Sequence, residues 1–469
     1  MHLFLYQKIR SKFQNKTKPE KKEEKQMEFV TGRKEQTTYS YTQLFAGDLE
    51  GQEVCVRGAI HNIRNMGEIQ FVILRRAEGL LQCVEEEDSK AFAKEALKDG
   101  DTVEITGILR KEERAPGGYE LRVTGVKLLS QPAAPMPLPI AKYRMNTSLE
   151  AMLTYRPVSL RNVRERAKFK IQEAVCRAFR EYLSREGFTE IHTPKIGAMS
   201  AEGGANIFKL EYFGKLAVLQ QSPQFYKQTM VGVFDRVFET APVFRAEKHN
   251  TTRHLNEYTS LDFEMGYIDG FEDIMDMETG YLQYLMELLK KDYAKELQIL
   301  DVTLPKVEQI PQVRFDEAKR LVSEAYDRPM RNPYDLEPEE EMLIGRYFKE
   351  HYDSDFVFVT HYPSKKRPFY AMDDPKDPKV TLSFDLLFRG MEITTGGQRI
   401  HDYDTIIEKM QARGMNPADA ESYLMIFKYG MPPHGGLGIG MERLTMKLID
   451  AANVRETTLF PRDVNRLEP

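Results

Sequence analysis

The sequence is poor in the residues and runs that mark secreted and membrane proteins. Its 469 residues include no tryptophan and only three cysteines, Cys55, Cys83 and Cys176, none of them in a CxxC pair. Their number and spacing exclude a disulfide scaffold and a cysteine-rich zinc site, and are typical of a protein in a reducing cytoplasm. No segment approaches the roughly 18–20 apolar residues that span a bilayer, so we expect no membrane partner.

Common motifs of nucleotide binding and hydrolysis are missing as well. The chain has no GxxxxGK[ST] phosphate loop, no HExxH, no GxSxG and no Asp/Asn-rich calcium loop. Gly436, Gly438 and Gly440 form a GxGxG run, but Met441 occupies the position of the third glycine in the dinucleotide pattern GxGxxG. A nucleotide would have to be bound by another arrangement of residues.

The charges are nearly balanced. Lys and Arg number 67 and Asp and Glu 72, a formal net charge of −5, with 41% hydrophobic and 30% charged residues. These values are those of an ordinary globular chain and exclude collagen-like, coiled-coil and wholly disordered proteins. The net charge argues against a non-specific nucleic-acid coat but leaves room for a local basic face.

The N-terminal stretch differs from the rest. Residues 1–30 carry eight Lys or Arg and four Glu, and Met27 lies near the end of this stretch. We predict a basic, disordered extension over residues 1–38. A true start at Met27 is an equally favoured alternative, and a weak organelle-targeting peptide is disfavoured by the glutamates.

A small β-barrel and a linker are predicted next. Between residues 39 and 130, five β-rich runs separated by turn signals, with one short helix over 91–98, follow the order of an OB-fold, a barrel that binds oligonucleotides. Another small barrel is the alternative. Four prolines within residues 131–140 favour a linker over 131–145.

The remaining segment, residues 146–469, has a mixed pattern. Apolar residues recur at helical spacing over 171–183, and strand-like runs such as 188–196 and 257–268 follow without regular crossover helices. This pattern predicts an α+β domain with an antiparallel sheet flanked by helices.

One strand of this domain carries a polar face. Tyr258, Ser260, Asp262 and Glu264 alternate with apolar residues, so they share one side of the strand. That side is either solvated or lines a ligand cleft, and Arg245 on the neighbouring strand favours the cleft.

Two further polar clusters follow. Asp385 and Glu392 offer oxygen ligands suited to a hard cation such as Mg²⁺, with Arg389 and Arg399 nearby in sequence. In the last cluster, a glycine-rich strand leaves room for a flat ligand, and Arg443 supplies a fork that matches phosphate oxygens.

Together these segments resemble the three signature motifs of class II aminoacyl-tRNA synthetases. FTEIHTPKI is similar to motif 1, FRAEKHNTTRHLNEY to motif 2 and GGLGIGMERL to motif 3. AEGGANIF, QSPQFYKQ, RGMEITTGGQRIHDYD, FKYGMPPHGG and LFPRD are similar to segments of subclass IIb aspartyl-tRNA synthetases of the archaeal and eukaryotic type. The likeness runs from about residue 40 to the C-terminus.

The resemblance implies a cytoplasmic, homodimeric enzyme that activates L-aspartate with ATP and Mg²⁺ and transfers it to tRNA(Asp). It implies catalytic roles for Arg245, Glu392 and Arg443. It implies ATP binding by Arg245, Glu247, Arg253, His254, Leu255, Tyr258, Glu392, Gly440, Met441, Glu442 and Arg443. Aspartate would be bound by Glu202, Gln224, Lys227, Arg245, Asp262, Thr395 and Arg399, and the metal by Asp385, Glu392 and Thr395.

The same resemblance implies that the barrel reads the tRNA anticodon through Arg64, Phe71 and Gln82. Phe71 would stack on an unpaired base; a place in the barrel core is the alternative for this residue. Ala59 stands where many relatives have tryptophan. This departure leaves open whether tRNA(Asn) is charged too.

Two cationic residues indicate which amino acid is the substrate. Lys227 and Arg399 would both face the substrate side chain, which favours a carboxylate, because an amide would leave both charges poorly paired in a closed site. An asparagine–tRNA ligase, a synthetase-like RNA-binding paralogue and an ammonia-dependent asparagine synthetase are the alternatives. The intact motif arginines argue against the paralogue, and the barrel argues against the asparagine synthetase.

Overall fold

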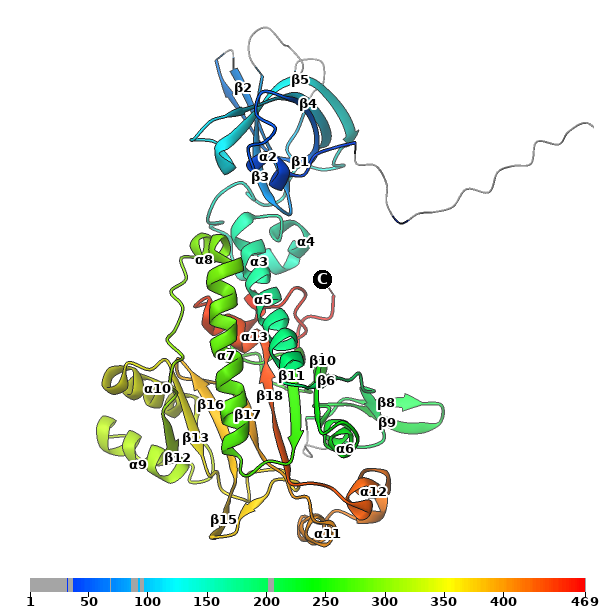
Figure 1. The fold of residues 1–469 in the computed structure, drawn as a ribbon, viewed down its shortest axis with the longest axis vertical. Helices are drawn as coiled ribbons and strands as arrows, with labels where there is room; N and C mark the ends of the chain where they lie inside the picture. Colours follow the sequence, from blue (N-terminus) through cyan, green and yellow to red (C-terminus); the bar gives the residue numbers. More distant parts are fainter. Residues whose placement is uncertain are drawn as a thin grey trace, which may run out of the picture. The chain divides into compact units, whose positions relative to one another are not determined.

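The computed structural model describes residues 32, 37–67, 69–85, 92, 97–200 and 206–468. The chain forms two compact units, the first ending at Ala133 and the second beginning at Ala134. Figure 1 colours them along the sequence, from blue through green to red.

The first unit is a closed five-stranded barrel in the order β1-β2-β3-β5-β4 (Figure 1). Inward-facing residues such as Val72 and Leu74 on β2 fill its apolar core. The barrel confirms the predicted OB-fold, while the helix expected over 91–98 falls largely outside the described residues. Its elements are α2 (Tyr41–Phe45), β1 (Glu53–Met66), β2 (Ile69–Arg76), β3 (Gly79–Glu85), β4 (Thr102–Lys111), η2 (Pro116–Gly118) and β5 (Tyr119–Ser130).

The second unit is built on an eight-stranded sheet in the order β12-β13-β16-β17-β18-β11-β10-β6. Its strands are β6 (Thr189–Glu190), β10 (Arg236–Phe244), β11 (Glu257–Gly266), β12 (Gln312–Arg314), β13 (Phe356–Thr360), β16 (Ser383–Phe388), β17 (Met391–Gln398) and β18 (His434–Gly440). The six central strands are antiparallel, as predicted. The two edges are not: β6 runs parallel to β10, and β12 parallel to β13.

The strand predicted over residues 188–196 is wrong in length, because only two of its residues, in β6, join the large sheet. Beyond Glu190 the chain leaves the sheet, and its residues contact the side chain of Glu239 instead of a neighbouring strand. The N–H and the hydroxyl of Thr193 both donate to the buried carboxylate of Glu239, at 2.7 Å. Lys195 pairs with the same carboxylate at 2.8 Å. These side-chain contacts take the place of the backbone hydrogen bonds that the predicted strand over residues 188–196 would have formed.

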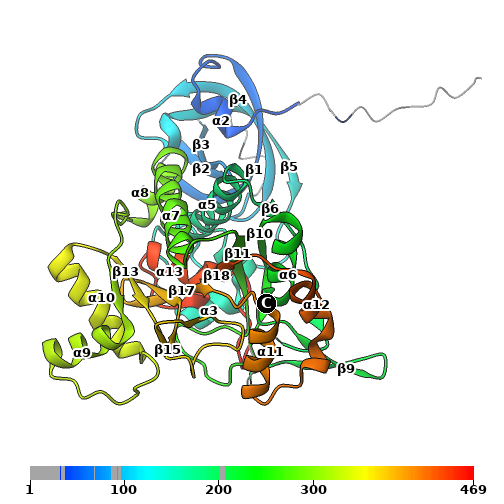
Figure 2. The same cartoon turned by 60° about the horizontal axis from the view of Figure 1, so that its bottom comes forward.

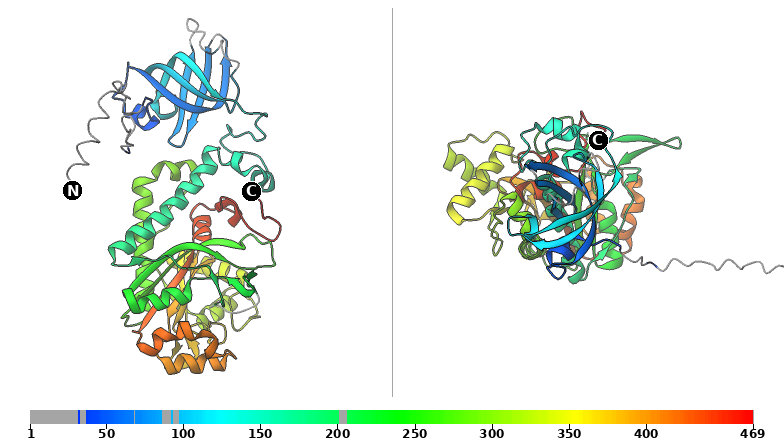
Figure 3. Two further views of the ribbon diagram at one scale, coloured as in Figure 1. Left: turned by 90° about the vertical axis from the view of Figure 1, so that its right-hand side faces the viewer. Right: turned by 90° about the horizontal axis from the view of Figure 1, so that it is seen from above.

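Two long helices cover one face of the sheet. Helices α5 (Val163–Arg185) and α7 (Glu272–Asp292) pack together on it (Figures 1 and 3). Alternate strand residues such as Leu261, Phe263 and Leu437 join the helices in one core. The residues between them in sequence therefore point to the opposite face.

Smaller elements lie around the sheet and its two long helices (Figure 2). The helices are α3 (Leu149–Thr154), α4 (Arg156–Ser159), α6 (Gln224–Phe234), α8 (Ala294–Leu300), α9 (Phe315–Tyr326), α10 (Pro338–Tyr352), α11 (Tyr403–Ala412), η3 (Pro417–Ala420), α12 (Glu421–Tyr429), α13 (Met441–Leu448) and η4 (Val454–Thr457). The short strands are β7 (Ile196–Gly197), β8 (Lys209–Tyr212), β9 (Lys215–Leu219), β14 (Asp373–Asp374) and β15 (Asp377–Thr381).

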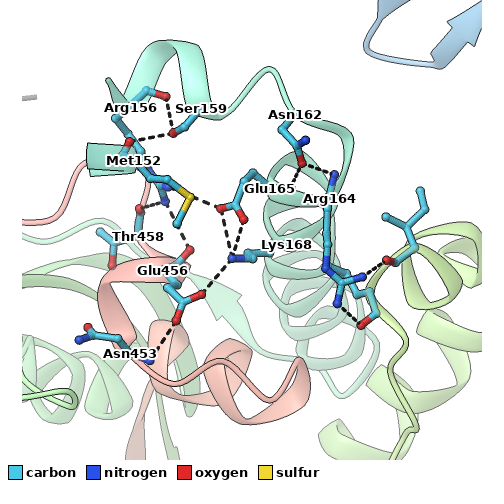
Figure 4. A network of polar contacts seen from close by, with 12 residues as sticks. Met152, Arg156, Ser159, Asn162, Arg164, Glu165, Lys168, Asn453, Glu456 and Thr458 are labelled. Carbon is cyan, nitrogen blue, oxygen red and sulfur yellow. Dashed lines mark hydrogen bonds and ion pairs between the residues drawn. The ribbon is translucent and has the colours of Figure 1, made fainter. Parts of the chain in front are cut away.

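A polar network fastens the C-terminal segment. The guanidinium group of Arg156, whose side chain is only 1% exposed, donates to three backbone carbonyls within residues 456–459 (Figure 4). Lys168 on α5 forms an ion pair with the same segment. Farther on, the carbonyl of Arg462 accepts the N–H of Asn256 at 2.8 Å. The C-terminal segment thereby holds the start of β11.

The described residues contain no helix that is long and apolar enough to cross a membrane. The three cysteines are free, which confirms the expectation that they form no disulfide.

Candidate active site

A row of residues crosses four strands on the sheet face opposite α5 and α7. Asp262 of β11 is paired with Gly438 of β18, Gly438 with Thr395 of β17, and Thr395 with Asp385 of β16. Residues directly opposite each other on antiparallel strands point to the same face. The sheet therefore brings Asp262 into one row with Asp385 and Thr395, which are more than 100 residues away in the sequence.

Glycines keep the middle of this face open. A Cβ atom at Gly436 would lie 2.2 Å from a carboxylate oxygen of Glu264, and one at Gly438 would lie 3.0 Å from Asp262. Both distances are shorter than a Cβ atom normally tolerates. The glycine-rich strand leaves room for neighbouring acids, in addition to the predicted room for a flat ligand.

A β-bulge aligns two of the predicted metal ligands. The register of β17 against β16 skips Ile393. This extra residue turns Glu392 and Thr395, three positions apart, to one face, where the Thr395 hydroxyl donates to Glu392 Oε1 at 3.4 Å. Regular alternation would have placed them on opposite faces.

Four buried charged residues form what we call the inner cluster: Lys227, Asp262, Glu264 and Arg399. Lys227 Nζ donates to Asp262 Oδ1 at 2.9 Å and lies 3.3 Å from Glu264 Oε2. Arg399 Nε donates to Glu264 Oε1 at 2.9 Å. These side chains are between 0% and 7% exposed. Two cations thus face two carboxylates without solvent.

The inner cluster decides between the two interpretations of the polar strand. A solvated strand face is wrong, because Asp262 and Glu264 are buried. Lys227 and Arg399 counteract the effect of this burial and keep the pKa of Glu264 below its usual value. The alternation on β11 had marked Glu264 as polar, but no site role was predicted for it. Its pairing with Arg399, 135 residues away, was invisible in the sequence.

Neighbouring polar groups extend the inner cluster. Gln224 Nε2 and Asp262 Oδ2 are buried and have no hydrogen-bond partner among the described residues, so both can serve a ligand. His434 Nε2 lies 3.1 Å from Gln228 Nε2, and its Nδ1 lies 2.9 Å from the carbonyl of Pro432. These contacts fit a neutral ring with its proton on Nδ1. Burial lowers the pKa of His434 to about 4.

A second group, the outer cluster, consists of Arg253, Glu341, Glu392 and Arg443. Arg253 Nη2 donates to both carboxylate oxygens of Glu341, at 3.1 and 2.8 Å. Arg443 Nη1 donates to the carbonyl of Glu392 at 3.1 Å and lies 3.5 Å from its carboxylate. Exposure rises here to 22% for Arg443 and 36% for Glu392. Glu341 was not predicted as a site residue.

Arg245 lies directly after β10, where its N–H donates to the carbonyl of Asn256 at 2.9 Å. Although burial works against it, the charges of Arg443, Arg253 and Arg245 lower the pKa of Glu392. The charge of Arg245 therefore acts on the outer cluster.

Other residues of the loop between β10 and β11 line this region. Glu247 accepts a hydrogen bond from the Asn206 amide at 3.0 Å. Burial and the charge of Arg443 lower the pKa of His254, so its ring is neutral near pH 7. Leu255 and Tyr258 pack in a small apolar cluster under the loop.

The predicted metal ligand Asp385 has a cationic partner. Arg367 Nη2 donates to its Oδ1 at 2.8 Å, and the guanidinium group lies over the ring of Tyr362, 3.9 Å from the centroid. Burial and the charge of Glu392 raise the pKa of Asp385, while Arg367 opposes this rise. Carboxylate and hydroxyl oxygens of Asp385, Glu392 and Thr395 suit Mg²⁺ when phosphate oxygens and water complete the shell.

That oxygen set is partial by itself. Among the residues that the structure describes, no group of three or more His, Cys, Asp or Glu side chains could hold a metal ion.

Three residues from the polar segments point away from these clusters. Arg389 lies in the turn after β16 and donates to the carbonyls of Lys447 and Thr303. Met441 packs in the core, and Glu442 accepts the N–H of Thr259 at 3.1 Å, where burial raises its pKa to about 7. Successive residues of α13 point in different directions, which separates Met441 and Glu442 from Arg443.

One predicted aspartate-binding residue, Glu202, lies outside the described residues. The other remaining predictions concern the barrel, where the anticodon-binding residues were expected. On the barrel, Arg64 and Phe71 are directly paired across β1 and β2. Phe71 is half-buried on the outer face, since Val72 and Leu74 point inward, so the core alternative is wrong. Gln82 Nε2 donates to Glu120 at 2.7 Å.

Comparison with known proteins identifies the family of both units. The model of the class II tRNA synthetases (D, K and N) matches residues 148–464, and that of the OB-fold nucleic acid binding domain matches residues 54–129. The chain is 47% identical to an aspartate–tRNA(Asp/Asn) ligase of Deinococcus radiodurans, covering 90% of this chain and 96% of the relative. It is 40% identical to an aspartate–tRNA(Asp) ligase of Pyrococcus abyssi, covering 92% and 99%.

Solved structures show the same architecture. An aspartyl-tRNA synthetase from Entamoeba histolytica is similar with a TM-score of 0.81 and 30% identity, covering 94% of this chain and 93% of that one. An asparaginyl-tRNA synthetase from Pyrococcus horikoshii, complexed with asparaginyl-adenylate, has a TM-score of 0.83 and 32% identity, covering 90% and 97%. The chain belongs to the class II aminoacyl-tRNA synthetases of the aspartate, lysine and asparagine group.

Proposed function

We propose that this chain is an aspartate–tRNA ligase, which activates L-aspartate with ATP and transfers it to tRNA(Asp). The observation that carries the proposal is the inner cluster, in which Lys227 and Arg399 lie buried beside Asp262 and Glu264. A substrate carboxylate can share the two cations, and Asp262 and Gln224 have buried polar atoms left for its ammonium group and carbonyl oxygen. Asparagine would lack the charge.

Activation needs no nucleophile from the protein. An oxygen of the aspartate α-carboxylate attacks the α-phosphorus of ATP, an O–P bond forms, and the bond to pyrophosphate breaks. Arg245 would hold the α-phosphate, and Arg253 and Arg443 would bind the departing phosphates. Positioning and stabilisation of negative charge supply the rate enhancement.

Asp385, Glu392 and Thr395 would hold Mg²⁺, which neutralises phosphate charge when bound. Arg367 donates to Asp385 Oδ1, and the hydroxyl groups of Tyr362 and Thr395 also interact with this carboxylate, so an ion would share Asp385 with these partners. Glu247, His254, Leu255 and Tyr258 would form the adenine side of the site, next to the loop.

Transfer requires tRNA. A terminal ribose hydroxyl attacks the activated carbonyl carbon, an ester forms, and AMP leaves. Arg64, Phe71 and Gln82 would bind the anticodon on the outer face of the barrel, where Phe71 is accessible for stacking.

The amino acid and tRNA can be tested directly. Pyrophosphate exchange is measured with aspartate and asparagine, and the purified enzyme is then given tRNA(Asp) and tRNA(Asn). We expect aspartate-dependent exchange and charging of tRNA(Asp). Exchange with asparagine alone would establish the asparagine–tRNA ligase alternative, and no exchange would refute both.

Charging of tRNA(Asn) is a second candidate activity. It is favoured by the name of the Deinococcus radiodurans relative, which gives both tRNAs. Ala59 in the first barrel strand leaves the question open. The charging assay with tRNA(Asn) decides it.

We also propose that the enzyme is a cytoplasmic homodimer that associates through motif 1, residues 188–196, which leads into β7 beside β9. The hairpin of β8 and β9 projects from the unit (Figures 1 and 3) and exposes Phe213 at 88% and Leu216 at 65%. Apolar exposure of this size suits a partner surface. Light scattering of the wild type and of the Phe213→Ser/Leu216→Ser variant tests whether the enzyme is a dimer. The three free thiols support the proposed cytoplasmic location.

A further inference from the structure

Helix α10 brings a carboxylate to the outer cluster from outside all three motifs. Glu341 lies in the first turn of α10 and is 5% exposed. One turn later, Gly345 packs against the turn between β16 and β17, so closely that a Cβ atom there would lie 2.4 Å from the backbone nitrogen of Gly390. Residues four apart share a helix face. The backbone contact therefore fixes the position from which Glu341 reaches the cluster.

Glu341 closes a ring of four residues from four separate elements. It accepts two hydrogen bonds from Arg253 Nη2 and one from the N–H of Glu392, at 2.9 Å. Arg443 completes the ring by donating to the carbonyl of Glu392 at 3.1 Å and to the carbonyl of Arg253 at 3.2 Å. Every link involves a charged partner, which makes such hydrogen bonds strong.

The ring gives Arg253 a defined side-chain position, although it lies on a loop. The long, flexible side chain loses conformational freedom when it is fixed, and Glu341 provides the contacts that offset this loss. Arg253 Nε is buried and has no hydrogen-bond partner among the described residues. It remains a donor for an incoming phosphate oxygen.

We propose that Glu341 is a positioning residue that presets Arg253 for the phosphates of ATP. It touches no substrate itself and acts through Arg253. This inference rests on the proposed function, in which Arg253 binds ATP. It predicts that loss of the Glu341 charge weakens ATP binding while aspartate binding is unchanged.

The test uses the full-length Glu341→Gln variant. Glutamine keeps the size and an acceptor for the N–H of Glu392, but removes the ion pair with Arg253. We expect the Kd for ATP, measured by isothermal titration calorimetry without aspartate, and the KM for ATP in pyrophosphate exchange to rise on the order of tenfold to a hundredfold. The KM for aspartate should stay within about twofold, since the inner cluster is intact.

Glu340→Gln is the matched control on the same helix. Glu340 pairs with Lys319 at 2.6 Å, in the small core around α9, and has no contact with the outer cluster. Its variant loses a buried ion pair too, so it should lower the thermal midpoint and leave the KM for ATP unchanged. An equal rise in this KM for both variants would show a merely structural role and overturn the proposal.

A double-mutant cycle separates action through Arg253 from independent action. In an Arg253→Gln background, Glu341→Gln should have no further effect on the Kd for ATP. Additive effects, or a wild-type Kd in Glu341→Gln, would refute the proposed role of Glu341. Absence of aspartate-dependent exchange in the wild type would instead refute the proposed function, so the two failures are distinguishable.

Discussion

The inner and outer clusters lie on the same sheet face and use the same chemistry, yet they differ in burial. The inner cluster has two cations and two carboxylates that are at most 7% exposed, carried by strands, α6 and the residue directly after β17. The outer cluster also has two of each, but its exposure reaches 36% and Arg253 comes from a loop. Under the proposed function, the first would bind the amino acid and the second the triphosphate.

The difference in burial between the two clusters has consequences for stability and for binding. In the closed inner cluster two cations are paired with two carboxylates, so the loss of one of these side chains is expensive, because unpaired buried ions are strongly unfavourable. An open cluster is screened by water and discriminates less, but it admits a large anion quickly. Substitutions in the two clusters should therefore have different consequences for stability and for substrate binding.

The largest effect is expected from Lys227→Leu. Removal of this cation leaves Asp262 and Glu264 underpaired in the interior, so the free energy of unfolding of the catalytic unit should fall by about 3–5 kcal/mol. The KM for aspartate should rise much more than that for ATP. Urea unfolding and pyrophosphate exchange measure the two changes.

Glu264→Gln is the matched second substitution for that variant. Because it removes one negative charge, the Lys227→Leu/Glu264→Gln double variant should be more stable than Lys227→Leu alone. If Glu264→Gln lowered stability equally in both backgrounds, the two residues would not be coupled, and the inner cluster would not act as one electrostatic unit.

The next largest effect is expected from lowering the pH, which should reduce stability through His434, next to the inner cluster. Its pKa in the folded chain, about 4, lies below the ordinary value of 6.5, so the unfolded chain binds the extra proton first as the pH falls. The His434 contribution to stability is present above pH 6.5 and should decrease by about 3 kcal/mol by pH 4.

The difference in unfolding free energy between the wild type and His434→Gln isolates this effect, because other titrating groups cancel. The stability advantage of the wild type should shrink as the pH is lowered from 6.5 to 4. A difference that does not depend on pH would contradict the buried, neutral state of His434.

Arg443→Ala should have a smaller effect on stability and a clear effect on ATP. This side chain is 22% exposed and shares the outer cluster with a second arginine. Unfolding free energy should change by less than about 1 kcal/mol. The KM for ATP should rise on the order of tenfold to a hundredfold, while the KM for aspartate is preserved. If the aspartate KM rose and the ATP KM did not, the two clusters would have been assigned in reverse.

The smallest effect is expected on the barrel. Phe71→Ala should weaken tRNA charging through KM on the order of tenfold, because one stacked base is worth about 1–3 kcal/mol. Pyrophosphate exchange without tRNA should be unchanged. Leu129→Ala, which removes an exposed apolar side chain from β5, is the control. An equal loss in both variants would contradict a specific contact by Phe71.

Sequence analysis predicted the architecture of both units, because the alternation on β11 and the glycines of β18 are local patterns; the roles of the site residues stay predictions. It also placed Asp385 with Glu392 and Thr395. It failed where side chains from distant segments replace regular pairing. Residues 193–195 turn toward Glu239 rather than extend β6, and nothing in the apolar pattern of that segment shows it.

Glu264, Arg367 and Glu341 were not assigned to the site for a related reason. Each is ordinary in its own segment and joins a buried charged cluster only through a partner from another segment. Glu341 lies 88 residues from Arg253, and its carboxylate had no neighbouring motif to mark it. The alternation on β11 marked Glu264 only as polar, and its burial in the structure excluded a solvated strand face.

The sequence by itself determined the family, the two folded units and the residue types that can bind ATP, a metal ion and an amino acid, since these depend on motifs and local periodicity. The tertiary structure alone decided which charges are paired and how deeply they are buried. The bulge at Ile393, the row from Asp262 to Asp385 and the approach of α10 all depend on packing between distant segments. Burial and distance set the strength of an electrostatic interaction, and neither is a local property of the chain.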